Sequence, residues 1–213
     1  MIRVAIVGIG GMGTVHFHNY QHIDGAEVVA FVDVSEKSRQ KALNWGPSLY
    51  STIDECAKSE DVDVFDICTP TFLHKQHVMQ ALGNHKHAIT EKPIALSKKD
   101  AEEMYALADQ NGKLLFVGQV LQFTKEIEIL RSLVQSEEYG KPLDAHLERL
   151  SACPRWVQDS WLFDKAKSGL LPFDLHIHDL DVIVSLFGTP ESFSFTSCKG
   201  QDKTYEEHYR FHY

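Results

Sequence analysis

The amino-acid sequence predicts an α/β protein, with a doubly wound parallel sheet over residues 1–121 and a partial α+β domain over residues 122–213. Three observations predict this architecture. Short apolar runs alternate with helical patterns through the first part, which is typical of a parallel sheet covered by helices on both faces. A glycine-rich turn follows the first apolar run. In the second part the final runs alternate apolar and polar residues, which indicates an open, mainly antiparallel sheet.

The parallel sheet is expected to begin with the apolar run from Ile2 to Val7, because β-branched residues without polar alternation are typical of a strand buried on both faces. A helical spacing at residues 14–23 and a second apolar run at residues 27–32 complete a βαβ unit with a right-handed crossover. Further strands are expected at residues 63–68, 87–90 and 114–117, and further helices at residues 35–45, 72–82 and 98–111.

The second part is expected to contain helices at residues 125–135 and 173–186 and strands at residues 145–152, 192–197 and 207–213. In the last strand aromatic and polar residues alternate, which should give it one apolar and one polar face. A sheet of about three strands with one or two helices lies near the lower limit of independent stability. We therefore expect this domain to be cut short or completed by another chain, as in a homo-oligomer formed through its sheet.

The composition is that of an ordinary soluble globular protein. Of 213 residues, 43% are hydrophobic and 24% charged, and 30 acidic against 21 basic side chains give a net charge of −9. This charge is unfavourable for binding nucleic acid or an anionic membrane surface. No apolar run is long enough to span a bilayer and the N-terminus lacks a signal-peptide pattern, so a cytoplasmic location is expected. The four cysteines form no Cys-x-x-Cys pair, which argues against a zinc ribbon or redox dithiol.

A dinucleotide-binding loop is indicated directly after the first strand. Residues 8–13 read Gly-Ile-Gly-Gly-Met-Gly, which matches GxGxxG between a predicted strand and a predicted helix. In such a loop the first glycine makes the tight turn, the second lets the backbone approach a pyrophosphate, and the third allows close packing of helix and strand. The N–H groups and dipole at the helix start then bind the phosphates. The expected cofactor-binding residues of the loop are Gly8, Ile9, Gly10, Met12 and Gly13.

An acidic residue in the expected place supports this interpretation. Asp33 lies 20 residues after Gly13, at the end of the second predicted strand, where a carboxylate can accept hydrogen bonds from ribose hydroxyls. Its charge would repel a 2′-phosphate, so NAD is favoured over NADP, although Lys37 and Arg39 are close enough to weaken this exclusion. The alternative is that Asp33 only caps the next helix. Together, these features predict a Rossmann domain that binds NAD.

Polar residues after two later strands extend the predicted site, because ligands of a doubly wound sheet bind at the carboxyl ends of its strands. Residues 68–70 (Cys-Thr-Pro) follow one strand and residues 91–93 (Glu-Lys-Pro) follow the next. Lys92 is expected near the nicotinamide end of the coenzyme. The alternative is a solvated lysine before a turn-forming proline.

The second domain offers an acid–base pair. Asp174 and His178 are four residues apart, so they share one face if their segment is helical. A carboxylate can orient an imidazole and stabilise its charged form, and an imidazole titrates near neutral pH. The alternative is an aspartate that caps the helix together with a core histidine.

These features together resemble the glucose–fructose oxidoreductase, inositol dehydrogenase and rhizopine catabolism protein family (Gfo/Idh/MocA). The resemblance spans nearly the whole chain, and the Glu-Lys-Pro motif with the Asp-to-His spacing is more specific than the glycine loop. Members of the family are generally longer, which implies that much of the substrate wall is missing here. The resemblance rests on residues 8–13, Asp33, residues 68–70 with His74, residues 91–93, and Ser168-Gly169 leading to Asp174 and His178.

The resemblance implies a two-domain NAD(P)-dependent oxidoreductase that transfers a hydride between a nicotinamide coenzyme and a secondary alcohol or ketone of a sugar, inositol or related polyol. By the same likeness, Lys92 helps to bind and polarise the reacting oxygen, His178 is the general acid/base, and Asp174 orients it. It further implies that the coenzyme is contacted by Thr69, Pro70, Glu91 and Gln119.

Side chains after the strand expected at residues 145–152 could line a substrate pocket, since tryptophan rings offer faces to a sugar, although tryptophan is also common in cores. These are Arg155, Trp156 and Trp161. Two other functions are a non-catalytic NAD-binding or assembly protein and an NAD-dependent glycoside hydrolase. A third is a metal hydrolase, although residues 176 and 178 would point to different sides of a helix and no metal site is expected. Its ligands would be Asp174, His176, His178 and Asp179.

Overall fold

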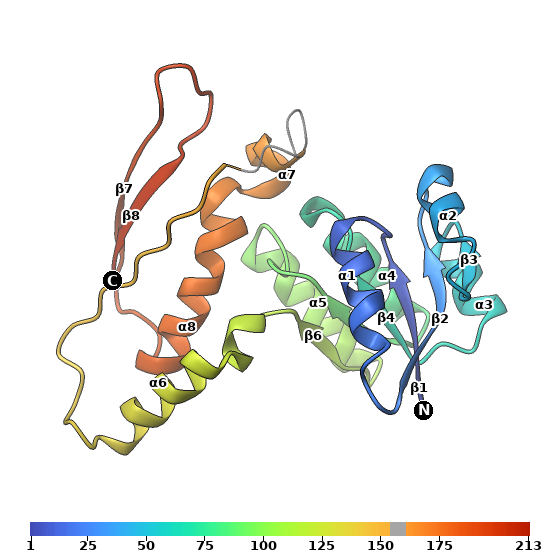
Figure 1. The fold of residues 1–213 in the computed structure, drawn as a ribbon, viewed down its shortest axis with the longest axis horizontal. Coiled ribbons are helices and arrows are strands. Elements are labelled where there is room, and N and C mark those ends of the chain that lie inside the picture. Colours follow the sequence, from blue (N-terminus) through green and yellow to red (C-terminus); the bar gives the residue numbers. More distant parts are fainter. Residues whose placement is uncertain (154–160) are drawn as a thin grey trace. The chain divides into compact units, whose positions relative to one another are not determined.

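The structure is a computed structural model that describes residues 1–153 and 161–213 (Figure 1). These residues form two compact units, residues 1–118 and residues 119–213, each with its own sheet. No helix in the described ranges is long and apolar enough to cross a membrane.

The first unit contains a six-stranded parallel sheet. Its strands are β1 (Ile2–Val7), β2 (Ala26–Val32), β3 (Ser48–Tyr50), β4 (Val64–Ile67), β5 (His87–Thr90) and β6 (Leu115–Val117). They lie in the order β3-β2-β1-β4-β5-β6. The sheet is therefore doubly wound, with its topological switch point between the central strands β1 and β4. The register pairs Val7 with both Val32 and Ile67, and Ile67 with Thr90, so four strands end at one edge.

Helices connect the strands of this sheet. They are α1 (Gly11–Tyr20), α2 (Glu36–Ala42), α3 (Ile53–Ser59), the short 3-10 helix η1 (Thr71–Leu73), α4 (His74–Gly83) and α5 (Lys98–Gln110). Ser35, Thr52 and Ser97 cap the starts of α2, α3 and α5 with side-chain oxygens that accept backbone N–H groups. At α3, Glu55 also accepts the backbone N–H of Thr52, which completes a capping box.

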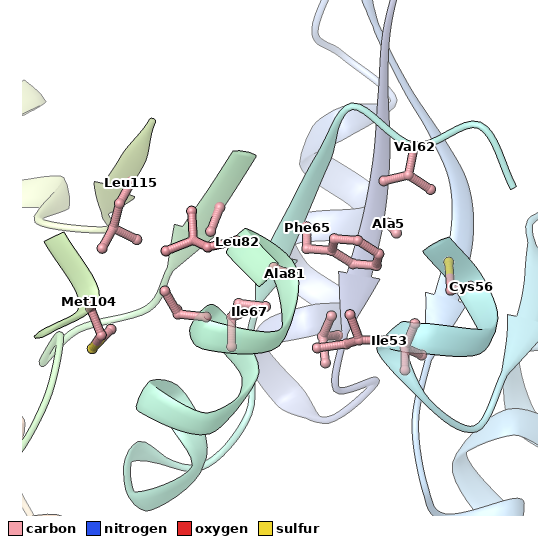
Figure 2. Close-up of a cluster of buried hydrophobic side chains, with 14 of the residues drawn as sticks. Ala5, Ile53, Cys56, Val62, Phe65, Ile67, Ala81, Leu82, Met104 and Leu115 are labelled. Atoms are coloured by element: carbon pink, nitrogen blue, oxygen red, sulfur yellow. The ribbon is translucent and has the colours of Figure 1, made fainter. Parts of the chain in front are cut away.

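Successive residues of each central strand point to opposite faces of the sheet, and both faces are covered by helices. On one face, Val4 and Ile6 of β1 pack in a cluster with Phe17 of α1 and Ala42 of α2. On the other face, a larger cluster joins the strands to α3, α4 and α5 around Phe65 of β4 (Figure 2). Burial on both faces explains why the strands appear in the sequence as continuous apolar runs.

The second unit contains several helices and a two-stranded antiparallel sheet. Its elements are η2 (Val120–Phe123), α6 (Lys125–Ser136), η4 (Trp161–Phe163), α7 (Lys165–Ser168), the π-helical turn η5 (Pro172–His176), α8 (Ile177–Phe187), β7 (Ser194–Cys198) and β8 (His208–His212). Tyr209 and Phe211 are partly buried, whereas their neighbours along β8 are exposed. This is the two-faced strand that the sequence predicts.

The structure differs from the sequence prediction in three places. The strand expected at residues 145–152 is not formed, because these residues pair with no strand in the described part of the chain. The sequence analysis also does not identify β3 and α3, which are three and seven residues long. Finally, α1 begins at Gly11 rather than at residue 14, because glycine is a weak helix former and hides the first turn.

Candidate functional site

The carboxyl ends of β2, β1, β4 and β5 meet at one edge of the sheet, which we call the site edge. Three backbone hydrogen bonds of 2.7–2.9 Å extend the strand ladder past these ends, from Gly8 N–H to the Val32 carbonyl, from Cys68 N–H to the Val7 carbonyl and from Glu91 N–H to the Ile67 carbonyl. They fix the first residue after each of β1, β4 and β5. The glycine loop and the polar segments after β4 and β5 are therefore neighbours, as the sequence predicts.

The glycine loop is shaped by close backbone contacts. Gly8 has a φ of +92°, and a Cβ there would lie 3.1 Å from the carbonyl oxygen of Cys68. A Cβ at Gly13 would lie 1.9 Å from the carbonyl oxygen of Gly8, so only glycine lets α1 approach β1 this closely. At Gly10, by contrast, no atom of the described chain lies within 4 Å of such a Cβ. Packing explains the first and third glycines, whereas the second leaves open space for a ligand.

The N-terminus of α1 opens onto this space. Among the described residues, no side chain caps the helix at Gly10, and the first turn carries no acidic residue. The first N–H groups of a helix have no partner within the helix, and the helix dipole gives them a partial positive charge. This end of α1 therefore favours an anion such as a phosphate. Met12 is 48% exposed beside it, whereas the side chain of Ile9 is buried in the cluster under α1.

Asp33 connects the end of β2 to the glycine loop. Its Oδ2 accepts the backbone N–H of Ile9 at 2.8 Å, and its Oδ1 accepts the backbone N–H of Ser35 at 2.8 Å. Ser35 is the residue that caps α2, so the alternative role of Asp33 as the helix cap is wrong. Each carboxylate oxygen has a second lone pair, so Asp33 can still accept hydrogen bonds from ligand hydroxyls. The guanidinium of Arg39 donates to the backbone carbonyl of Asp33, and Lys37 is exposed.

The segments after β4 and β5 are joined by a buried histidine. The two ring nitrogens of His74, a residue only 1% exposed at the start of α4, lie 2.8 Å from the carbonyl oxygens of Thr69 and Pro93. Thr69 also places its hydroxyl 3.0 Å from Nδ1 of His77. Pro70 precedes η1, and the peptide between Lys92 and Pro93 is cis. The predicted cofactor residues after β4 and the predicted reactive lysine after β5 thus belong to one hydrogen-bonded structure.

Both carboxylate oxygens of Glu91 have hydrogen-bond partners. Its Oε1 lies 3.0 Å from Nε2 of His16 on α1, and its Oε2 accepts the backbone N–H of Lys92 at 3.1 Å. Glu91 is only 8% exposed. Burial alone would raise the pKa of Glu91, but His16 and the Lys92 N–H outweigh it and lower the pKa below its ordinary value. The side chain is therefore a carboxylate held in one orientation between the His16 ring and the Lys92 backbone N–H.

His16 is the centre of a charged cluster that the sequence analysis does not identify. Its Nδ1 lies 2.8 Å from Oδ2 of Asp66, a residue 1% exposed in β4, and 3.3 Å from Sγ of Cys68. These groups and Glu91 raise the pKa of His16 to about 12, with Asp66 the largest cause and burial the opposing one. The sequence does carry a signal, because Asp66 is a lone carboxylate inside an otherwise apolar buried strand. A carboxylate in such a strand indicates a polar or charged partner packed against it.

Among the described residues, one group of histidine, cysteine and acidic side chains is close enough to hold a metal ion, namely His16, Asp66 and Cys68. Their atoms are already in direct hydrogen bonds, and the other nitrogen of His16 faces Glu91. The arrangement is therefore that of an imidazolium between two carboxylates. In the second unit, two of the residues considered for a metal hydrolase have protein partners, since Asp179 is paired with Arg149 and His176 Nε2 lies 2.6 Å from the Tyr213 hydroxyl.

The remaining predicted residues belong to the second unit. Asp174 lies in the π-helical turn η5 and His178 lies in the first turn of α8, and both are partly buried. The side-chain oxygen of Gln119 is buried and has no hydrogen-bond partner in the described ranges. Trp161 begins η4. Arg155 and Trp156, which were predicted to contact substrate, lie outside the described residues.

A doubly wound sheet with a glycine loop, a helix N-terminus and an acid after β2 at its site edge has the architecture of a dinucleotide-binding Rossmann domain. Comparison with protein-family models agrees. Residues 2–119 match the model described as "Oxidoreductase family, NAD-binding Rossmann fold" (GFO_IDH_MocA), and residues 127–208 match the "GFO/IDH/MocA C-terminal domain". The chain therefore belongs to the Gfo/Idh/MocA oxidoreductase family, and NAD is the cofactor that this fold binds.

Similar proteins include sugar and inositol dehydrogenases. The chain is 30% identical over 194 residues to glucose-6-phosphate 3-dehydrogenase of Bacillus subtilis (strain 168), covering 88% of this chain and 54% of that protein. It is 28% identical over 189 residues to myo-inositol 2-dehydrogenase of Thermotoga maritima, covering 88% and 55%. The chain thus spans about half the length of the curated relatives it matches.

A solved structure supports the fold over nearly the whole chain. The crystal structure of an oxidoreductase from Agrobacterium radiobacter in complex with NAD+, L-tartaric acid and magnesium superposes with a TM-score of 0.90. The match covers 99% of this chain and 62% of that one, at 21% sequence identity. Together, the comparisons do not favour the alternatives of a non-catalytic NAD-binding protein or a glycoside hydrolase.

Proposed function

We propose that the protein transfers a hydride between NAD and a secondary alcohol or ketone of a sugar, inositol or related polyol. The observation that carries this proposal is the site edge, which brings the glycine loop, Asp33 and Lys92 to the ends of adjoining strands. The named activities of the similar dehydrogenases support the substrate class. Bound NAD would supply the hydride acceptor, and the protein would supply binding, orientation and electrostatics.

The residues of this chain would then have separate roles. Phosphates of the coenzyme would bind at the N-terminus of α1, where Gly10 leaves room for them. Asp33 would accept ribose hydroxyls with its remaining lone pairs, and its negative charge would disfavour a 2′-phosphate. NAD is therefore proposed as the coenzyme in preference to NADP. Thr69, Pro70, Glu91 and Gln119 remain proposed coenzyme contacts, by resemblance to the family.

For the chemical step we propose Lys92, Asp174 and His178. The ammonium group of Lys92 would stabilise negative charge that develops on the reacting oxygen. In the oxidation direction, His178 would take the hydroxyl proton and Asp174 would stabilise the imidazolium that results. The hydrogen bond from the Lys92 backbone N–H to Glu91, which also contacts His16, supports the proposal, because a fixed backbone helps to position a catalytic lysine.

The test combines coenzyme titration with a substrate screen. In the wild-type protein, NADH fluorescence titration should show binding, and a panel of sugars, inositols and sugar phosphates should show NAD reduction. The Lys92→Ala variant should lose at least a thousandfold in kcat while its Kd for NADH stays within about threefold. The matched control is Lys58→Ala, an exposed lysine at the end of α3, which should behave as wild type.

Other outcomes would contradict the proposal. Wild-type turnover in Lys92→Ala would remove the role of the lysine. Coenzyme binding without turnover on any member of the panel would favour a non-catalytic NAD-binding protein. Release of sugar from an aryl glycoside without net NADH would instead indicate NAD-dependent glycoside hydrolysis.

A further inference from the structure

Lys92 stands between two residues that are each held by a histidine from a different helix. On one side, the carboxylate of Glu91 lies 3.0 Å from Nε2 of His16 on α1. On the other side, the carbonyl oxygen of Pro93 lies 2.8 Å from Nδ1 of His74 on α4. The two helices belong to opposite faces of the sheet, since α1 packs with one cluster and α4 with the other. The segment that carries Lys92 is therefore fixed from both faces.

Each histidine is anchored in turn to β4 or to the segment directly after it. His16 contacts Asp66 of β4 through Nδ1 at 2.8 Å, and His74 contacts the carbonyl oxygen of Thr69 through Nε2 at 2.8 Å. Both rings thus bridge the region of β4 to the residues after β5. Neither contact is needed to close the strand ladder, which β4 and β5 already form through backbone hydrogen bonds.

We propose that His16 and His74 are positioning residues that fix Lys92 from the two faces of the sheet. This inference rests on the proposed catalytic role of Lys92. His16 acts through the carboxylate of Glu91, which accepts the Lys92 backbone N–H at 3.1 Å, and His74 acts through the carbonyl of Pro93. A lysine whose ammonium group must meet one oxygen of a substrate gains most from such restraint, because misplacement by about 1 Å costs on the order of a hundredfold in rate.

A positively charged His16 ring can donate hydrogen bonds to Asp66 and to Glu91 at the same time. The groups that face its ring are Asp66 and Cys68 from the β4 region and Glu91 after β5. Tyr20, from the same helix, interacts with Asp66. Together with the burial that opposes them, these groups leave the pKa of His16 at about 12, so both ring nitrogens donate at neutral pH. For His74, burial outweighs the two carbonyl contacts and lowers the pKa, so the neutral ring donates to one of the two carbonyl oxygens at a time, according to its tautomer.

Asparagine and glutamine substitutions test the two contacts of each histidine ring separately. An asparagine amide reaches about as far as Nδ1, and a glutamine amide reaches about as far as Nε2. In His16→Gln the contact with Glu91 can be kept, whereas in His16→Asn only the contact with Asp66 can be kept. At position 74 the order is reversed. His74→Asn can keep the contact with Pro93, and His74→Gln can keep only the contact with Thr69.

The first readout is hydrogen exchange at the Lys92 backbone amide, measured on the NAD-bound protein. It should rise at least tenfold in His16→Asn and remain within threefold of wild type in His16→Gln, because only the second variant can hold Glu91 against this amide. The core amides of β1 report the overall stability, and they should exchange at the same rate in the two variants, so a difference confined to the Lys92 amide is local. His18→Asn and His18→Gln, at an exposed histidine of the same helix, are the matched controls and should change neither quantity.

The second readout is steady-state kinetics. His16→Asn and His74→Gln should each lower kcat at least tenfold, with KM and the Kd for NADH within threefold of wild type. The other variant at each position, His16→Gln or His74→Asn, should keep most of the wild-type kcat. A histidine that only stabilises the fold would not produce this crossed pattern, since both variants at one position would then lose activity together with thermal stability.

The outcomes separate this inference from the proposed function. If Lys92→Ala retains wild-type turnover, the proposed function fails, whatever the exchange data show. If Lys92→Ala is inactive while folded His16→Asn and His74→Gln keep wild-type kcat and amide exchange, the positioning inference fails alone. Equal losses in the asparagine and glutamine variants at both positions would also overturn it.

Discussion

Oδ2 of Asp33 accepts the backbone N–H of Ile9 at 2.8 Å, so the acid after β2 helps to build the glycine turn after β1. Sequence patterns assign the glycines and the acid to different parts of a ligand. In the folded chain they form one hydrogen-bonded unit, because Oδ1 of the same carboxylate also accepts the backbone N–H of Ser35. Coenzyme affinity and loop geometry are therefore expected to respond together when Asp33 is changed.

The first prediction concerns Asp33→Ala. The variant loses the acceptor for Ile9 N–H and the negative charge proposed to exclude a 2′-phosphate. We expect the Kd for NADH to rise about tenfold, or about 1.4 kcal/mol, while the ratio of NADPH to NADH affinity increases. Fluorescence titrations with both coenzymes measure these effects. Glu36→Ala, an exposed acid in the first turn of α2, is the control, and an unchanged NADH Kd in Asp33→Ala would refute the expectation.

Three of the four loop glycines, Gly10, Gly11 and Gly13, are expected to respond differently to alanine. Gly13→Ala places a Cβ 1.9 Å from the carbonyl oxygen of Gly8, so the free energy of unfolding should fall by about 3 kcal/mol. Gly10→Ala meets no described atom within 4 Å, so it should keep its stability but weaken NADH binding at least tenfold. Gly11→Ala also has open space, and its effect on stability in the absence of coenzyme measures helix propensity. Thermal unfolding and NADH titration of all three variants distinguish these effects. Equal stability of Gly13→Ala and Gly10→Ala would contradict the expectation that a Cβ at residue 13 collides with the Gly8 carbonyl.

Alkaline pH should destabilise the protein through His16. Its pKa is raised to about 12, so between the ordinary histidine pKa of about 6.5 and that value the native state holds a proton that the unfolded chain has lost. This contribution is complete below about pH 6.5 and decreases as pH rises, by at most about 1.4 kcal/mol per pH unit. Urea unfolding at pH 7, 8 and 9 measures the slope.

His16→Gln removes the raised group and should flatten this dependence, whereas His18→Gln should keep it. Burial also raises the pKa of the Cys68 thiol to about 12, which destabilises the native state in the same direction, but only above about pH 8.5. The comparison of variants between pH 7 and 8 therefore isolates the imidazole. A steep slope that persists in His16→Gln would assign the effect to another group.

The stability of the second unit should also depend on pH, in this case at acid pH through Asp179. Burial alone would raise the pKa of Asp179, but the nearby His176 ring and hydrogen bonds from Arg149 outweigh it and lower the pKa to about 2. The stability that this provides is present above about pH 4 and is lost as pH falls toward 2. Arg149→Ala should lower the stability of the second unit at pH 7 by about 1 kcal/mol and reduce its loss on acidification. Lys165→Ala, an exposed cation on α7, should leave both unchanged in the same acid titration.

Much of the first unit could be predicted from the sequence, because its strands and helices follow from patterns within short stretches of residues. The strand from Ile2 to Val7 and the helix from Lys98 to Gln110 follow from apolar runs and helical periodicity. The positions of Asp33 and Glu91 follow from the rule that ligands bind where parallel strands end. The strand expected at residues 145–152 is wrong because a strand forms only where a neighbour completes its hydrogen bonds, and such a neighbour has no local signature.

The histidine contacts could not be predicted for a related reason. His16 and Glu91 are separated by 75 residues and His74 and Pro93 by 19, so neither pairing has a fixed spacing. Only the crossing of α1 and α4 over the sheet brings these atoms together. The roles of Asp174 and His178 stay predictions, which the kinetic experiments above address.

The single carboxylate in β4 also restricts how the sheet can assemble. Asp66 points to the face of His16, while its neighbours Phe65 and Ile67 point to the face of α3, α4 and α5. If β4 slipped by one residue against β1 and β5, the carboxylate would enter the apolar layer and two large hydrophobic side chains would meet the imidazolium. Each misaligned pairing would leave a buried ion without a counter-ion. This one polar residue therefore disfavours one-residue slips of β4, because the carboxylate would change faces in each of them.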